Sequence, residues 1–182
     1  TVYSLNESKA GKEIKIIESN QDLASKLKGY NLPSKEFFVL KTEKGNELNA
    51  WIIKPKDFDS AKKYPVFMYQ YSGPGSQQVN NEWNAADDYW FMMLTQKGYI
   101  VACIDGRGTG FKGADFKKVT QLQLGKYEVE DQIDAAKVIG AYPYVDASRI
   151  GIFGWSYGGF MASNCIFQGA DVFKMAIAVA PV

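Results

Sequence analysis

The sequence predicts an α/β protein with a mostly parallel sheet that carries helices on both faces. From residue 65 onward, strand-like runs alternate with segments of helical apolar spacing, which is typical of strand–helix–strand units. Residues 99–104 form a continuous apolar run, the pattern of a parallel strand buried on both faces. Before this part, runs at 37–40 and 48–53 flank a turn signal at 43–46, which predicts an antiparallel hairpin.

The other elements follow from periodicity and from residues that begin or end helices. We expect strands at 1–5, 14–17, 65–71, 149–154 and 174–180, and helices at 21–27, 83–97, 127–140 and 157–168. Asn20 is a candidate N-cap for the first helix, and Gly98 ends the second. Acidic residues in the first turn of the third helix suit the positive end of its dipole. The apolar composition of 174–180 predicts a buried strand.

The composition excludes several classes of function. The 182 residues are 46% hydrophobic and 23% charged, so the chain is globular rather than disordered. A net charge of +1 argues against nucleic-acid binding through a strong basic field, and no apolar run is long enough to span a membrane. Cys103 and Cys165 cannot form a disulfide-rich scaffold and are expected to be small buried hydrophobes. Because the chain contains no histidine, it lacks the commonest general base and metal ligand, and no metal site is expected.

The strongest motif is Gly154-Trp155-Ser156-Tyr157-Gly158, followed by Gly159. It fits G-x-S-x-G between a predicted strand and a predicted helix, which is the setting of a nucleophile elbow. Small neighbours let strand and helix approach, so that the turn lifts the Ser156 hydroxyl clear of the sheet. The turn also aims the Tyr157 backbone N–H at a developing oxyanion. A glycine-rich turn without a catalytic role is the alternative interpretation.

Tyr71 is the second candidate, because it ends a predicted strand and enters the irregular loop Ser72-Gly73-Pro74-Gly75. A tyrosine there can direct its phenol into a cleft at the carboxyl edge of the sheet, where ligands bind in open α/β folds. A phenol O–H is a competent oxyanion donor. On the pattern alone, a core aromatic is the simpler interpretation, because the chain has 11 tyrosines.

Several motifs together resemble one family. In chain order they are Tyr71-Ser72-Gly73-Pro74, Asp105-Gly106-Arg107-Gly108-Thr109-Gly110, Glu128-Val129-Glu130-Asp131-Gln132, Gly154-Trp155-Ser156-Tyr157-Gly158-Gly159 and Ala178-Val179-Ala180-Pro181-Val182. This set resembles the dipeptidyl-peptidase IV branch of the prolyl-oligopeptidase serine peptidases. The resemblance implies the N-terminal part of an α/β-hydrolase catalytic domain at 36–182, truncated at its C-terminus. Residues 1–35 would be an entry segment, the end of a preceding β-propeller and a linker.

The resemblance also implies a function and roles for the site residues. The full-length protein would release dipeptides from peptides with Pro or Ala at the second position. Ser156 would be the nucleophile, Tyr71 the side-chain oxyanion donor and Tyr157 the backbone donor, with the Tyr157 ring lining the substrate pocket. Trp155 would either contact substrate or pack the elbow. No metal, organic cofactor or nucleic acid is implied, the parent protein would be a homodimer, and an exported location is favoured with the cytoplasm left open.

The chain departs from the family pattern at the triad. In α/β-hydrolases an acid and then a histidine follow the serine, but only Asp171 follows Ser156 here and no histidine exists. Asp171 precedes the last predicted strand, so we do not assign it. We therefore expect the chain to be part of a longer enzyme and to be inactive alone. An edge strand exposed by truncation is expected to cause self-association.

Two other functions stay open: another α/β-hydrolase, such as an esterase or acylaminoacyl peptidase, and a catalytically dead binding module.

The segment Gly108-Thr109-Gly110-Phe111-Lys112-Gly113 also matches G-x-G-x-x-G, a dinucleotide-binding pattern. Its acids at the required distance, Glu130 and Asp131, lie in a predicted helix instead of after a strand, so a flexible loop is favoured. Arg107 in this loop is expected to face solvent.

Overall fold

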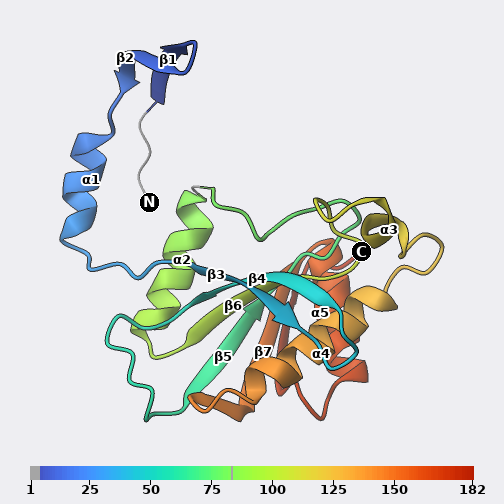
Figure 1. The fold of residues 1–182 in the computed structure, drawn as a ribbon. Coiled ribbons are helices and arrows are strands. Elements are labelled where there is room, and N and C mark those ends of the chain that lie inside the picture. Colours follow the sequence, from blue (N-terminus) through green and yellow to red (C-terminus); the bar gives the residue numbers. More distant parts are fainter. Residues whose placement is uncertain (1–4, 83) are drawn as a thin grey trace.

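The computed structural model describes residues 5–82 and 84–182, and a six-stranded mixed sheet forms its main body (Figure 1). The strand order is β3-β4-β6-β5-β7-β8. The strands are β3 (Glu36–Lys41), β4 (Glu47–Ile53), β5 (Tyr64–Tyr69), β6 (Ile100–Asp105), β7 (Val145–Trp155) and β8 (Met175–Val179). β3 and β4 form the predicted antiparallel hairpin, and β4 pairs antiparallel with β6. The pairs β5–β6, β5–β7 and β7–β8 are parallel, so the predicted fold class is confirmed.

Helices cover both faces of this sheet, as Figure 1 shows. Helix α2 (Ala85–Gln96) lies on one face, where Phe91 packs with Trp51, Phe67 and Val101. Helices α4 (Tyr127–Gly140) and α5 (Tyr157–Gln168) lie on the other face. The larger core there joins side chains of both helices to β4, β5, β6 and β7; among its fully buried members are Ala136, Met161, Met68, Ala102 and Ile152. Burial of these side chains from water is the main driving force for holding the two layers together.

The N-terminal part stands away from the sheet in Figure 1. It consists of the antiparallel hairpin β1 (Leu5–Lys9) and β2 (Lys12–Glu18), followed by α1 (Gln21–Lys28), none of whose residues is buried. The strand predicted at 14–17 lies within β2, whereas residues 1–4 of the strand predicted at 1–5 lie outside the described residues. The proposed boundary at residue 35 and the origin of this part in a propeller stay predictions.

Asn20 is the N-cap residue of α1, as predicted, but its side chain does not cap the helix. Asn20 has a left-handed backbone with φ 54°, and its side chain makes no capping hydrogen bond. A side-chain cap needs an N-cap residue in the extended region, so that the side-chain oxygen can reach the free N–H groups of the first turn. Here the backbone N–H of Asn20 instead donates to a carboxylate oxygen of Glu18 at 2.7 Å.

The elements that frame the carboxyl edge of the sheet differ from expectation in three places. β5 ends at Tyr69 rather than at Tyr71, because the backbone turns at Ser72, whose φ is 61°. The short helix α3 (Ala114–Lys118) was not predicted, and the helix expected from residue 83 is described from Ala85, with Trp83 outside the described residues.

Strand β8 lies at the edge of the sheet, and the prediction that its side chains are buried is wrong. Met175 is 44% exposed and Ile177 is 39% exposed. β8 pairs with β7 on one side and has no pairing partner on the other among the described residues. Self-association through this edge stays a prediction.

Cys103 and Cys165 are both buried and free, as expected. None of the described helices combines the length and the apolar character that crossing a bilayer requires.

Candidate active site

Ser156 lies between the last residue of β7 and the first residue of α5, in the setting that the motif predicts. Its backbone has φ 54° and ψ −117°, a sparsely populated conformation for a residue with a Cβ atom. The backbone N–H of Ser156 donates to the carbonyl of Val179 at 2.9 Å, and its carbonyl accepts from the N–H of Phe160 at 3.0 Å. Hydrogen bonds from β8 and α5 therefore hold the strained turn and leave the Ser156 side chain partly exposed.

The glycines around the serine are required by close backbone approaches. A Cβ at Gly154 would lie 2.2 Å from the carbonyl oxygen of Gly158. A Cβ at Gly158 would lie 2.6 Å from the carbonyl oxygen of Gln70, and one at Gly159 would lie 2.8 Å from that of Val179. These distances are far below van der Waals contact, so strand and helix can meet at this angle only without side chains.

Replacing Gly158 with alanine is therefore expected to destabilise the fold around the six-stranded sheet. The new methyl group must displace the backbone of Gln70, and overpacking of this kind costs about 1–3 kcal/mol. Urea unfolding of the full-length protein, followed by tryptophan fluorescence, measures this change in the free energy of unfolding. Gly29→Ala is the matched control, because a Cβ there would meet its nearest neighbour at an ordinary 3.7 Å. Equal stability of the two variants would contradict the packing argument.

Tyr157 directly follows the serine, and Tyr71 lies close to Tyr157 and Gly158. Tyr157 is the first residue of α5, so its backbone N–H has no partner within the helix and is free to donate to a bound oxyanion. The rings of Tyr71 and Tyr157 have centroids 6.2 Å apart. None of the described residues accepts a hydrogen bond from the Tyr71 phenol or the Ser156 hydroxyl. The structure thus brings the three predicted residues together, while their chemical roles stay predictions.

The loop that carries Tyr71 is held from behind by buried polar groups. Ser72 is buried, and its hydroxyl oxygen accepts from the side-chain amide of Gln132 at 3.3 Å. Further along the loop, the backbone N–H groups of Gln78 and Val79 donate to the Asp105 carboxylate at 3.0 and 2.8 Å. Burial raises the pKa of Asp105 to about 6, although these two hydrogen bonds act in the opposite direction. These contacts fix the loop in which the phenol lies.

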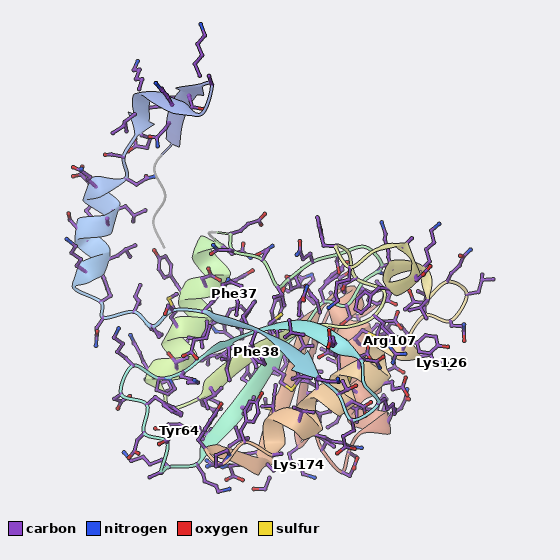
Figure 2. All side chains as sticks on the ribbon, viewed as in Figure 1. Phe37, Phe38, Tyr64, Arg107, Lys126 and Lys174 are labelled. Carbon is purple, nitrogen blue, oxygen red and sulfur yellow. The ribbon has the colours of Figure 1, made fainter. Side chains whose placement is uncertain are left out.

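The expectation that Arg107 faces solvent is wrong. Its guanidinium donates to both carboxylate oxygens of the fully buried Asp131, at 2.6 and 2.9 Å, and to Glu130 at 2.7 Å. Burial alone would lower the pKa of Arg107, but these hydrogen bonds and charges outweigh it and raise the pKa. Figure 2 shows Arg107 near Lys126, and both cations lie over the ring of Tyr127, at 4.7 and 4.9 Å from its centroid.

The same contacts bear on the G-x-G-x-x-G segment. Glu130 and Asp131, the acids at the spacing of a dinucleotide site, are both engaged by Arg107, and Lys44 also pairs with Glu130. The helix after the segment has only five residues. These observations favour a structural loop tied to α4 by ion pairs over a nucleotide site.

Trp155 is the last residue of β7 and is 59% exposed beside Ser156. Its side chain is therefore available to a substrate, and its assignment to substrate binding stays a prediction.

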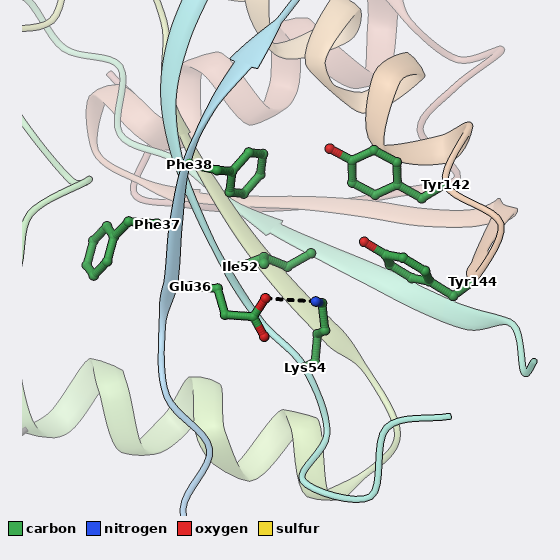
Figure 3. Close-up of a pocket in the computed structure, with 7 residues that line it drawn as sticks. All are labelled: Glu36, Phe37, Phe38, Ile52, Lys54, Tyr142 and Tyr144. Carbon is green, nitrogen blue, oxygen red and sulfur yellow. Dashed lines mark hydrogen bonds and ion pairs between the residues drawn. The ribbon is translucent and has the colours of Figure 1, made fainter. Parts of the chain in front are cut away.

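A pocket of about 190 Å³ lies at the other end of the sheet (Figure 3). The aromatic rings of Phe38, Tyr142 and Tyr144 and the ion pair between Lys54 and Glu36, with its atoms 2.8 Å apart, line it. No candidate catalytic residue contributes to that pocket.

Known proteins are similar to this chain in sequence and in fold. The sequence model of the prolyl oligopeptidase family matches residues 85–182. The chain is 48% identical over 167 residues to "Probable dipeptidyl-aminopeptidase B" of Paracoccidioides lutzii, covering 91% of this chain and 18% of that protein. It is 39% identical over 184 residues to "Prolyl endopeptidase FAP" of Bos taurus, covering 100% of this chain and 23% of that protein.

Solved structures agree with the sequence relatives. The crystal structure of Porphyromonas gingivalis dipeptidyl peptidase 4 superposes with a TM-score of 0.88 and 50% sequence identity, over 98% of this chain and 25% of that one. The chain thus spans about a fifth to a quarter of the length of the relatives it matches. With a family match over more than half of its residues and a shared fold around the serine, this chain belongs to the prolyl oligopeptidase family.

Proposed function

We propose that the full-length protein is a serine exopeptidase that releases dipeptides from peptides with Pro or Ala at the second position. The observation that carries the proposal is the strained turn at Ser156, which is followed by the free N–H of Tyr157, with the ring of Tyr71 6.2 Å from that of Tyr157. The similarity to dipeptidyl aminopeptidases and to dipeptidyl peptidase 4 supports the substrate class. Dimerisation of the full-length protein and its export stay predictions from the resemblance.

The geometry favours acyl transfer through an acyl-enzyme. The Ser156 oxygen would attack the carbonyl carbon of the second residue of the peptide, while a base takes the hydroxyl proton. The resulting oxyanion would accept hydrogen bonds from the Tyr157 N–H and the Tyr71 phenol. Collapse of this tetrahedral intermediate would break the bond between the second residue's carbonyl carbon and the next residue's nitrogen. The rest of the peptide would leave as an amine that carries the proton taken by the base. Water, losing a proton to the base, would then attack the ester; the C–O bond to Ser156 would break, the dipeptide would leave with a new carboxyl group, and the base would return the proton to the Ser156 oxygen.

In the proposed reaction the base would be a histidine of the full-length protein, because the 182 residues contain none. A serine hydroxyl is a weak nucleophile unless a base lies next to it. We therefore infer that the 182-residue chain alone has no peptidase activity. No step of the proposed reaction requires a metal or an organic cofactor.

A substrate panel on the full-length protein tests this function. We expect hydrolysis of the chromogenic anilides of Gly-Pro and Ala-Ala, and little hydrolysis of N-acetyl-Ala anilide or of p-nitrophenyl acetate. Preference for the N-acetyl substrate would favour an acylaminoacyl peptidase, and preference for the ester would favour an esterase. No turnover of any of the four would favour a binding module. The isolated chain, assayed in parallel, is expected to turn over none of them.

A further inference from the structure

A buried carboxylate outside the proposed catalytic group contacts the residue that follows the serine. Glu128 is the second residue of α4 and is fully buried. One of its oxygens accepts a hydrogen bond from the Tyr157 phenol at 2.7 Å, and the other accepts from the backbone N–H of Gly125 at 3.1 Å. A carboxylate in the first turn of a helix is also stabilised by the helix dipole. The charge of Glu128 is thus satisfied in part by Tyr157.

The Tyr157 ring has aromatic neighbours in addition to the hydrogen bond that its phenol donates to Glu128. The ring lies edge to face with Phe160, with centroids 5.7 Å apart, and in a tilted arrangement with Tyr71. Such contacts favour certain arrangements of the rings but do not engage the hydroxyl group. The hydrogen bond to Glu128 fixes the hydroxyl end. Burial, followed by this hydrogen bond, raises the pKa of Tyr157, so the phenol stays a donor at neutral pH.

We propose that Glu128 is a positioning residue that holds Tyr157 at both of its working parts, the ring and the backbone N–H. This inference rests on the proposed function, in which the ring lines the substrate pocket and the N–H binds the oxyanion. Because ring and N–H belong to one residue next to Ser156, an anchor at the phenol restricts how far the whole residue can tilt. A misplacement of about 1 Å at a reacting group can cost roughly 100-fold in rate.

Two substitutions of Glu128 separate positioning from charge. In Glu128→Gln, the amide oxygen can accept from Gly125 and the amide N–H can donate to the phenol oxygen, so both contacts survive without the charge. In Glu128→Leu, a side chain of similar size makes neither hydrogen bond. Tyr157→Phe removes the same hydrogen bond from the other side and keeps the ring. Glu130→Gln is the matched control, since Glu130 lies in the same turn but pairs with Arg107 and Lys44.

The experiment measures kcat and KM of the full-length variants with Gly-Pro anilide, together with their melting temperatures. We expect Glu128→Leu and Tyr157→Phe each to lower kcat/KM by roughly 10- to 100-fold, and Glu128→Gln to recover most of that loss. The double variant Glu128→Leu/Tyr157→Phe is expected to lose no more than either single variant, because both remove one contact. Glu130→Gln is expected to keep the wild-type kcat/KM.

The outcomes also separate this inference from the proposed function. If the wild-type protein does not hydrolyse Gly-Pro anilide, the proposed function fails. If the wild type is active and Tyr157→Phe or a folded Glu128→Leu matches it, Glu128 does not position Tyr157. Losses that multiply in the double variant would also overturn the inference. Should Glu128→Leu fail to fold, Tyr157→Phe alone decides the question, because the ring and the backbone remain.

Discussion

Replacing Ser156 with alanine in the full-length protein is expected to lower kcat for Gly-Pro anilide by about 10⁶-fold. Alanine keeps the Cβ atom in the strained turn at φ 54°, so the backbone strain and the glycine contacts are unchanged. Only the oxygen that would form the bond to substrate is removed. KM is expected to change little, because the neighbouring binding groups stay in place.

Ser163→Ala is the control for this result. Ser163 lies on α5, the helix that follows Ser156, and its hydroxyl donates to the carbonyl of Gly159 at 3.0 Å. Its replacement is expected to leave kcat near the wild-type value. If Ser156→Ala retained more than about one per cent of wild-type kcat, Ser156 would not be the nucleophile, because nucleophile removal costs orders of magnitude more.

The second large effect is expected for Tyr71→Phe. Loss of one oxyanion donor costs about 10²–10³-fold in kcat, and phenylalanine keeps the ring contact with Tyr157. KM is expected to stay within a few-fold of wild type, because the hydrogen bond would form only as negative charge develops on the substrate oxygen. Steady-state kinetics with Gly-Pro anilide measure both constants.

Tyr142→Phe removes a phenol from the pocket at the other end of the sheet and should be without effect on kcat. A Tyr71→Phe variant as active as Tyr142→Phe would leave the backbone N–H of Tyr157 as the main oxyanion donor. A Tyr71→Phe variant with raised KM and unchanged kcat would show that the phenol binds the ground state instead.

The sequence predicted the elements around the serine because local chemistry determines them. The glycines of the elbow indicate a place where two backbone segments approach closely. In the structure, a Cβ atom added at any of the three would lie 2.2 to 2.8 Å from a backbone carbonyl oxygen. The helices at 127–140 and 157–168 have the predicted bounds, since their apolar spacing and their glycine boundaries act within a few residues. Tyr71 could be placed near the site because a strand must end before Gly73-Pro74-Gly75.

Contacts between distant segments could not be predicted in this way. Arg107 pairs with Asp131, and Glu128 accepts from Tyr157, across connections that no periodicity encodes. The acids at 128–131 fit a helix dipole, the family motif and the spacing of a dinucleotide site, but none of these patterns predicts that they are the partners of Arg107 and Tyr157. The first turn of α4 holds Glu128 and Glu130, and the buried residues of the helix include Glu128 and Asp131. Acidic side chains are seldom fully buried unless they are paired, so an acid on the apolar face of a helix is the signal that could have indicated a partner.

The exposure of β8 shows that an apolar sequence pattern alone does not determine burial. Its composition is that of a buried strand, but burial depends on what lies beside a strand, and β8 is at the edge of the sheet described here. An apolar pattern therefore predicts that a strand can be buried and does not identify the element that covers it.

The central claim is that the hydroxyl of Ser156 is an activated nucleophile in the full-length protein. Incubation with a fluorophosphonate, followed by proteolysis and mass spectrometry, tests it most directly. We expect one covalent adduct, located on Ser156, and none in the Ser156→Ala variant or in the isolated chain without histidine. Full-length protein that stays unlabelled at Ser156, or that carries the adduct on another residue, would contradict the account.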